Sequence, residues 1–139
     1  MQLLKNKIPR LLFAATILLT SCDLITESYF QGRLIGMAKK FNQKGPQLIA
    51  EGVRLDSLTV EPKKTLVYHY TMTKLVFKDI DTAIWNKTLD SVLLAEIKVV
   101  PDMKELRDHD VTFVYDYFDK NQQRIALLRF PPTVYKTKN

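Results

Sequence analysis

The stretch Thr65–Met72, Thr-Leu-Val-Tyr-His-Tyr-Thr-Met, gives the clearest strand signal in the chain. β-branched and aromatic residues, which favour extended backbone, make up most of it. Successive side chains of a strand point to opposite faces of the sheet. One face should therefore carry Leu66, Tyr68, Tyr70 and Met72, and the other should carry Thr65, Val67, His69 and Thr71.

Three more strands are predicted around this one, so that two hairpins result. Val53–Val60 precedes it, and Pro62 in the intervening segment suits a type I turn. Val111–Phe118 and Arg124–Phe130 form the second hairpin around Asp119–Gln123. Pro131 and Pro132 end the last strand, because proline cannot donate a hydrogen bond to a strand ladder.

Two helices are predicted, one before each hairpin. In the first, Tyr29–Lys44, a helical period places Phe30, Leu34, Met37, Ala38 and Phe41 inward, whereas Lys39, Lys40, Asn42 and Gln43 point away. The second begins at Asp79 or Asp81 and runs to about Lys98. The order α-β-β-α-β-β predicts an α+β fold in which a four-stranded antiparallel sheet carries both helices on one face.

The N-terminus has the pattern of a secretory signal. Lys5, Lys7 and Arg10 are followed by the apolar run Leu11–Leu19, which is too short to span a bilayer as a helix. The run ends in Leu19-Thr20-Ser21-Cys22, which resembles the bacterial lipoprotein signal. The resemblance implies cleavage before Cys22 and acylation of that residue, the only cysteine in the chain. The alternative is a free Cys22 thiol beside an uncleaved signal-anchor.

The expected organisation is therefore one lipid-anchored domain. Residues 1–21 are the signal peptide, 22–28 the acylated cysteine and a short tether, 29–132 a single α+β domain, and 133–139 a polar tail. Without the signal, 18 basic and 15 acidic residues remain, a net charge of +3. The basic residues are interspersed with acidic ones, which does not favour nucleic-acid binding.

No motif predicts catalysis, a metal site or a cofactor. His69 and His109 are the only histidines, and neither belongs to a hydrolase or metalloprotease motif. We expect His69 to be an ordinary strand residue and His109 a loop residue. Asp79 and Asp81 are spaced like the start of a calcium loop, but the glycine and distal glutamate of such a loop are missing.

Aromatic residues of the two central strands form the candidate binding surface: Tyr68, Tyr70, Phe113, Tyr115 and Tyr117. Most of these rings should belong to the core. The functional alternative is that some of them line a groove between sheet and helix, which could hold an amphipathic helix or an acyl chain.

Three stretches, Val53–Val60, Leu66–Thr71 and Val111–Asp119, resemble a family of small bacterial envelope proteins. The shared arrangement is a helix, a hairpin ending in Tyr-x-Tyr, a second helix, and a hairpin beginning with a Tyr-x-Tyr strand. The layout is also similar to that of type II secretion pilotins, lipoproteins that bind a short helix of an outer-membrane secretin. Related sequences often carry two further cysteines, which are absent here from Val99–Pro101 and Thr133–Tyr135.

The resemblance implies a non-enzymatic protein anchored by its lipid to a bacterial membrane and facing the periplasm. Its partner would be another envelope protein or a short helix, bound in a pilotin-like or scaffold role. Whether the membrane is the inner or the outer one stays open. The alternative is an inhibitor or immunity protein against a toxin or wall hydrolase, for which Asp119–Gln123 would be the protruding loop.

Overall fold

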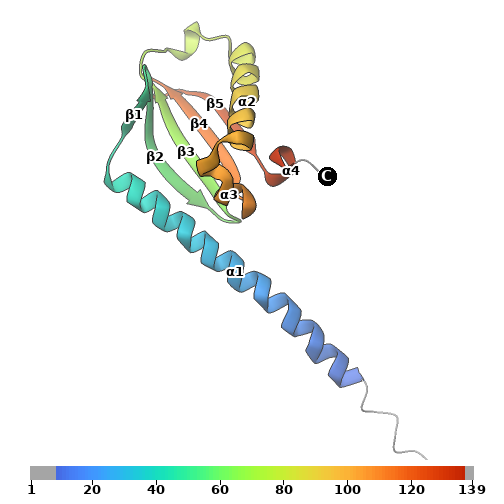
Figure 1. Cartoon of the computed structure of the whole chain (residues 1–139). Helices are drawn as coiled ribbons and strands as arrows, with labels where there is room; N and C mark the ends of the chain where they lie inside the picture. The colour runs from blue at the N-terminus through green and yellow to red at the C-terminus, as the bar shows by residue number, and fades with distance from the viewer. Residues whose placement is uncertain (1–8, 137–139) are drawn as a thin grey trace, which may run out of the picture.

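The computed structural model describes the backbone of residues 9–136 and the side chains of residues 26–136. A long helix, α1 (Pro9–Gln43), leads into three strands, β1 (Gln47–Ala50), β2 (Val53–Glu61) and β3 (Thr65–Met72). The central connection contains the 3₁₀ turns η1 (Phe77–Asp79) and η2 (Pro101–Met103) and the helices α2 (Thr82–Val99) and α3 (Lys104–Asp108). Strands β4 (Thr112–Asp119) and β5 (Arg124–Phe130) and the short helix α4 (Pro132–Tyr135) complete the fold (Figure 1).

The sheet is five-stranded and mixed, which corrects the predicted four-stranded antiparallel sheet. Its order follows the sequence from β1 to β5, and every neighbouring pair is antiparallel except β3 with β4. When a long helical segment separates two hairpins, the second hairpin can begin parallel or antiparallel to the last strand of the first. Here the segment from Thr73 to Val111 returns the chain to the end of the sheet at which β3 begins, so β4 runs parallel to β3.

The predicted strand faces are confirmed. Leu66, Tyr68 and Tyr70 of β3 pair in register with Phe113, Tyr115 and Tyr117 of β4, and all six belong to the hydrophobic core or pack against it. The opposite face carries Val67, His69 and Thr71, which pair with Val114, Asp116 and Phe118. The aromatic side chains therefore lie on one face of the sheet, and most of the polar ones lie on the other.

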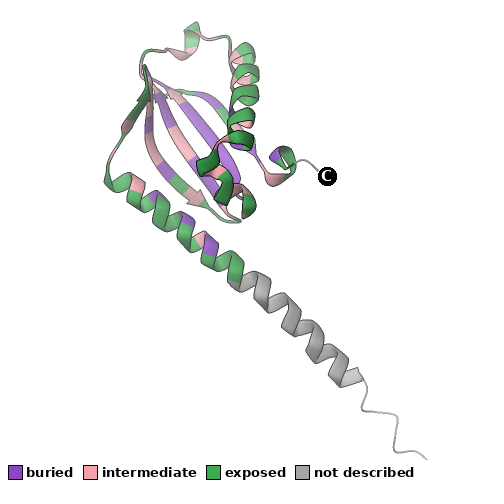
Figure 2. Cartoon of the chain, viewed as in Figure 1, coloured by how far each residue is buried: buried purple, intermediate pink, exposed green. Residues whose placement is uncertain are grey.

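Both predicted helices pack on the aromatic face, where they share one core (Figure 2). Helix α1 contributes the buried residues Phe30, Leu34 and Ala38, and α2 contributes Leu93 and Ile97. Met37, expected inward, is 38% exposed because it lies at the boundary of the apolar stripe, near α3. The helical layer thus covers the sheet on one side only.

The elements near the domain boundaries are also helical. Helix α1 includes residues 22–28, the predicted tether, as well as the following segment. Helix α4 begins at Pro132, and its Tyr135 is buried, donating a 2.7 Å hydrogen bond from its hydroxyl to the carbonyl oxygen of Val111. The cleavage and tether boundaries stay predictions, since they concern a processing event.

Local sequence explains where α2 begins and ends. The carboxylate of Asp81 caps the helix by accepting hydrogen bonds from the backbone N–H groups of Ala83 and Ile84. At the other end, Pro101 follows the last residues of the helix, and Arg107 donates to the carbonyl oxygens of Ile97 and Val100. These bonds supply partners for carbonyl groups that have none within the helix.

Candidate functional site

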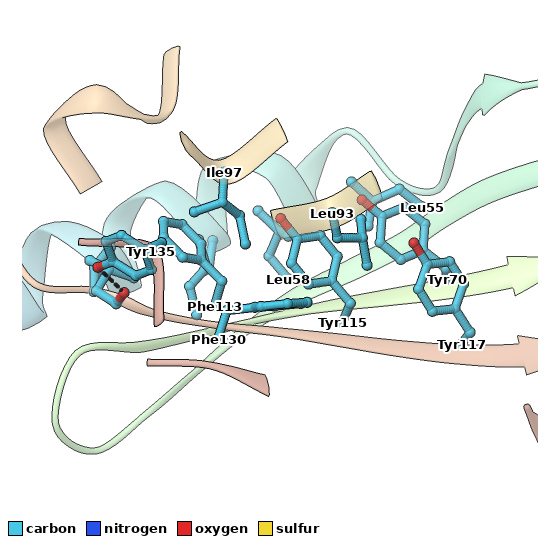
Figure 3. Close-up of a cluster of buried hydrophobic side chains, with 14 of the residues drawn as sticks. Leu55, Leu58, Tyr70, Leu93, Ile97, Phe113, Tyr115, Tyr117, Phe130 and Tyr135 are labelled. Atoms are coloured by element: carbon cyan, nitrogen blue, oxygen red, sulfur yellow. Dashed lines mark hydrogen bonds between the residues drawn. The ribbon is translucent and has the colours of Figure 1, made fainter. Parts of the chain in front are cut away.

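Four tyrosines form a stacked ladder on the helix-covered face of the central strands, and Figure 3 shows three of them. Parallel pairing sets Tyr68 beside Tyr115 and Tyr70 beside Tyr117, with ring centroids 5.0 and 4.9 Å apart. The ring planes within each pair are nearly parallel, with interplanar angles of 8° and 13°. The repeated Tyr-x-Tyr pattern therefore builds a single aromatic cluster across two strands.

The ladder is mostly core. Phe113, Tyr70, Tyr115 and Tyr117 are buried, and Tyr115 is only 4% exposed. Tyr68 alone is half-buried. The structure therefore brings all five residues of the candidate binding surface together, but it leaves most of their ring surface covered by α1, α2 and neighbouring strands.

The hydroxyls of the ladder are neutral. Burial raises the pKa of Tyr70 to about 12, and the carboxylate of Glu96 on α2 adds to the effect. The pKa values of Tyr68, Tyr115 and Tyr117 are also raised, first by burial and then by neighbouring tyrosines. Such phenols stay protonated at physiological pH, so they can offer hydrogen bonds but do not act as bases or nucleophiles there.

An open hollow lies beside the ladder, between the outer side of α1 and the second half of β2. Its apolar lining comes from Ile35 and Ala38 of α1 and from Leu58 and Val60 of β2. The lining also includes four polar residues: Lys39, Asn42, Gln43 and Thr59. Ile35 is 52% exposed, so the hollow presents accessible apolar surface.

Two amides of α1 hold β2 and the turn after it against the helix, and one of them, Asn42, lines this hollow. The side chain of Asn42 accepts a 2.9 Å hydrogen bond from the backbone N–H of Leu58 and donates a 2.8 Å bond to its carbonyl oxygen. Gln31 donates to the carbonyl oxygen of Glu61 and accepts from the N–H of Lys64. Asn42 was expected to point away from the sheet. Its amide instead bonds both backbone groups of Leu58, as a neighbouring strand would, because it offers a donor and an acceptor together.

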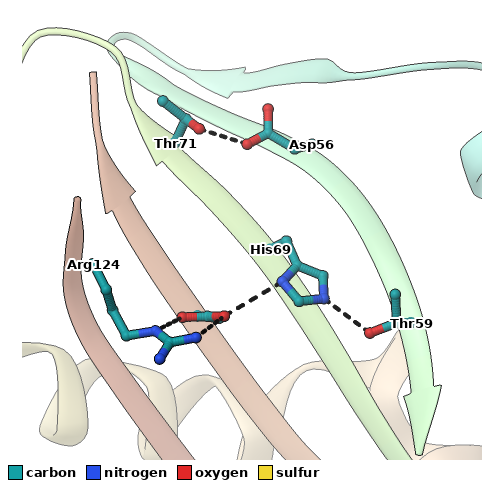
Figure 4. A network of polar contacts seen from close by, with 6 residues as sticks. Asp56, Thr59, His69, Thr71 and Arg124 are labelled. Atoms are coloured by element: carbon teal, nitrogen blue, oxygen red, sulfur yellow. Dashed lines mark hydrogen bonds and ion pairs between the residues drawn. The ribbon is translucent and has the colours of Figure 1, made fainter. Parts of the chain in front are cut away.

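The face of the sheet that no helix covers carries a polar network centred on Asp116 (Figure 4). Arg124 donates to both carboxylate oxygens of Asp116, at 2.7 and 3.1 Å. His69 lies between Asp116, with Nδ1 3.5 Å from a carboxylate oxygen, and Thr59, whose hydroxyl is 2.8 Å from Nε2. Asp56 accepts a 2.5 Å bond from Thr71 nearby.

The contacting side chains of Thr59, His69 and Asp116 line up a hydroxyl, a base and a carboxylate, as in a catalytic triad. Their surroundings favour a structural role. Arg124 already neutralises the buried carboxylate of Asp116. The hydroxyl belongs to Thr59 on β2, and the neighbouring backbone N–H of Leu58 is already donated to the side-chain oxygen of Asn42. A developing oxyanion would need preorganised donors beside the nucleophile. We interpret the network as the polar cover of buried Val67 and Val114.

The other residues considered from the sequence have structural partners. The ring of His109 stacks on Phe30, with centroids 3.9 Å apart. Asp81 is the N-cap of α2, and Asp79 lies in η1. Among the side chains described, residues 26–136, no group of three histidine, cysteine or acidic residues gathers in a way that could hold a metal ion.

The turn Asp119–Gln123, which the inhibitor hypothesis required to protrude, is tightly held. The carboxylate of Asp119 accepts 2.8 Å hydrogen bonds from the backbone N–H groups of Asn121 and Gln123 within the turn and of Phe77 in η1. Burial would raise the pKa of this carboxyl, but the backbone donors outweigh that effect and lower it. The turn is therefore fixed to the sheet and to the connection before α2.

The predicted acylation site lies on α1, but the side chain of Cys22 falls outside the described residues. Residues 1–8 of the predicted signal also lie outside them. In the part of the chain that is described, no helix has the length and hydropathy needed to cross a membrane. Lipidation thus stays a prediction from the sequence.

Sequence reasoning placed the aromatic residues together and allowed for a groove between sheet and helix, but it did not identify the residues that line the hollow. The residues that build the hollow, Ile35, Lys39 and Asn42, occupy the flank of the α1 stripe, and the hydrophobic period alone assigns such positions to solvent. The shortness of β1 also hid this strand, so the sequence did not show that the outer edge of β2 is paired only from Val53 to Leu55.

The fold is shared with two solved structures. A protein from Pseudomonas aeruginosa described as a "putative secreted protein" matches with a TM-score of 0.65 and 18% identity, over 79% of this chain and 96% of that one. EpsS, the pilotin of the Vibrio vulnificus type 2 secretion system, matches with a TM-score of 0.63 and 9% identity, over 81% of this chain and 96% of its own. The pilotin-like layout expected from the sequence is therefore confirmed at the level of the fold.

Curated proteins gave no match to this sequence. One family model does match it, and it covers residues 30–127, which include both central strands, α2 and residues 30–43 of α1. By that match, the chain belongs to the family described as domain of unknown function DUF8479.

Proposed function

We propose that this protein is a lipid-anchored, non-enzymatic component of the bacterial envelope that binds another envelope protein in a pilotin-like role. The observation that carries the proposal is the fold shared with a secretion-system pilotin over most of both chains. The signal-like N-terminus and Cys22 supply the anchor in this account. Attachment of acyl chains would hold the domain at a membrane, since each buried methylene contributes about 0.8 kcal/mol.

The structure offers a place for the partner. The hollow between α1 and β2 combines apolar and polar lining residues, as protein-binding sites generally do. It lies directly over one side of the aromatic core, where Leu58 and Ala38 are buried. A rigid core beneath an open surface keeps that surface preformed, which lowers the entropic cost of binding.

A non-enzymatic role is supported by the chemistry of the described side chains. The tyrosine hydroxyls are protonated, and Asp116 is committed to Arg124. Neither set provides an activated nucleophile with a free base beside it. We therefore propose binding rather than catalysis.

The proposal is tested by capture from envelopes. The full chain with a C-terminal affinity tag is expressed in its native host, solubilised in mild detergent and recovered after a salt wash, and bound proteins are identified by mass spectrometry. A secretin or another assembly component is the expected catch. A toxin or wall hydrolase as the dominant catch would overturn the pilotin-like role in favour of inhibition.

Anchoring is tested separately with Cys22→Ser. The intact protein should incorporate an alkyne-labelled palmitate analogue and sediment with membranes, whereas Cys22→Ser should incorporate none. Equal labelling of both proteins would contradict acylation at Cys22. Ser21→Ala serves as the matched control, because it alters the neighbouring residue and keeps the cysteine.

A further inference from the structure

The second half of β2 has an unpaired edge. Strand β1 pairs with β2 only from Val53 to Leu55, so the residues from Leu58 onward have no strand neighbour on that side (Figure 1). At Leu58 the Asn42 amide takes both outward backbone groups. Outward-pointing backbone groups recur every second residue along an edge, so those of Val60 come next.

Val60 lies in the hollow described above. Its side chain contributes to the apolar lining with Ile35 and Leu58, next to its own outward N–H and carbonyl groups. The site therefore combines a short strand edge with an apolar surface beside it. A bound helix satisfies its own backbone groups, whereas an extended segment can pair with the edge and also place a side chain in the hollow.

The lining of the hollow includes a cation for which the described side chains supply no counter-ion. Lys39 lines the hollow, and no ion pair to it is found among residues 26–136. By contrast, Arg33 on the same helix is paired with Glu105. A carboxylate on the bound segment would therefore find an uncompensated positive charge at the rim.

We propose that the partner binds as an extended segment that adds to the edge of β2 at Val60, with an apolar side chain in the hollow and an acidic side chain at Lys39. This inference rests on the proposed partner-binding function and specifies its mode. Strand addition obtains affinity from backbone hydrogen bonds and specificity from the pockets that receive alternate side chains.

The probe is a blocked seven-residue peptide of alternating valine and threonine with one central glutamate. It is titrated into the ¹⁵N-labelled full chain in detergent micelles, and amide shifts and amide hydrogen exchange are followed by NMR. We expect the shifts to centre on Leu58–Glu61 and α1, and exchange at Val60 to slow by tenfold or more. The same peptide with an ester replacing the central amide should bind more weakly.

Two variants test the two parts of the site. Lys39→Glu should weaken binding of the glutamate peptide by roughly two- to fivefold, and it should strengthen binding of the same peptide with lysine in place of glutamate. Lys40→Glu, on the same helix but outside the hollow, should leave the affinity for both peptides unchanged. Val60→Pro removes the outward N–H at an edge where proline is tolerated, and it should weaken binding by about fivefold.

Two outcomes would overturn the inference. One is a shift pattern centred on Tyr68 and α2, which indicates helix binding at the aromatic ladder. The other is an absence of shifts at Val60 at millimolar peptide. Neither touches the proposed function, which fails only if capture from envelopes returns no assembly component.

Discussion

Replacing Tyr115 by alanine tests whether the aromatic ladder is core. Its ring is buried, stacks on Tyr68 at 5.0 Å and meets the edge of Phe130 at 5.9 Å. Truncation of a buried aromatic residue costs about 3–5 kcal/mol in the free energy of unfolding. Tyr115→Phe removes only a hydroxyl that has no hydrogen-bond partner among the described residues, so it should change stability by less than about 0.5 kcal/mol.

The assay is urea unfolding of the full chain in mild detergent, followed by the fluorescence of the single tryptophan, Trp85. With a slope of about 1–3 kcal/mol per molar urea, the alanine variant should lower the midpoint by roughly 1–5 M. Tyr29→Ala is the control, since Tyr29 is 69% exposed and makes no contribution to the core. If Tyr115→Ala lowers the midpoint no more than Tyr29→Ala, the ladder is not the core and its rings are free to bind a ligand.

Three further predictions concern local structure. Asp81→Ala should destabilise the protein by about 1 kcal/mol in the same urea assay, because it removes the cap of α2, whereas Asp79→Ala should have less effect. The lowered pKa of Asp119 means that its carboxylate stabilises the fold above the unfolded pKa of about 3.9 and that this contribution is lost as pH falls through the folded pKa. Asp119→Asn should therefore flatten the pH dependence of unfolding below about pH 4. Ile97→Val should cost about 0.5–1.5 kcal/mol, and Ile97→Ala about 2–5 kcal/mol, with calorimetric unfolding as the measure; equal effects would show that α2 does not pack there.

Patterning of the strands carried most of the fold prediction. The period of two in Thr65–Met72 assigned Tyr68 and His69 to opposite faces, and the structure confirms this. The period of the first helix identified Phe30, Leu34 and Ala38 as core. Both results depend on burial of one face, which leaves a direct record in the order of apolar and polar residues.

The direction of β4 and the structure at the sheet edge have a weaker signal in the sequence. Whether β4 runs parallel or antiparallel to β3 depends on the path of the 39-residue connection, and the strand pattern is the same in both cases. Strand β1 has four residues and mostly exposed side chains, so it lacks alternation. Asn42 shows the same limit at the site, because a single amide on a helix flank gives no sign of whether it meets water or a strand edge.

Site-specific photo-crosslinking tests the central proposal, that this protein binds another envelope protein through the hollow between α1 and β2. A photoreactive amino acid replaces Ile35, in the hollow, or Ile84, a more exposed residue of α2 outside it. After irradiation of intact cells, the account predicts that the Ile35 variant crosslinks to a specific envelope protein and that the Ile84 variant does not. Equal crosslinking from both positions, or none from Ile35, would contradict the account.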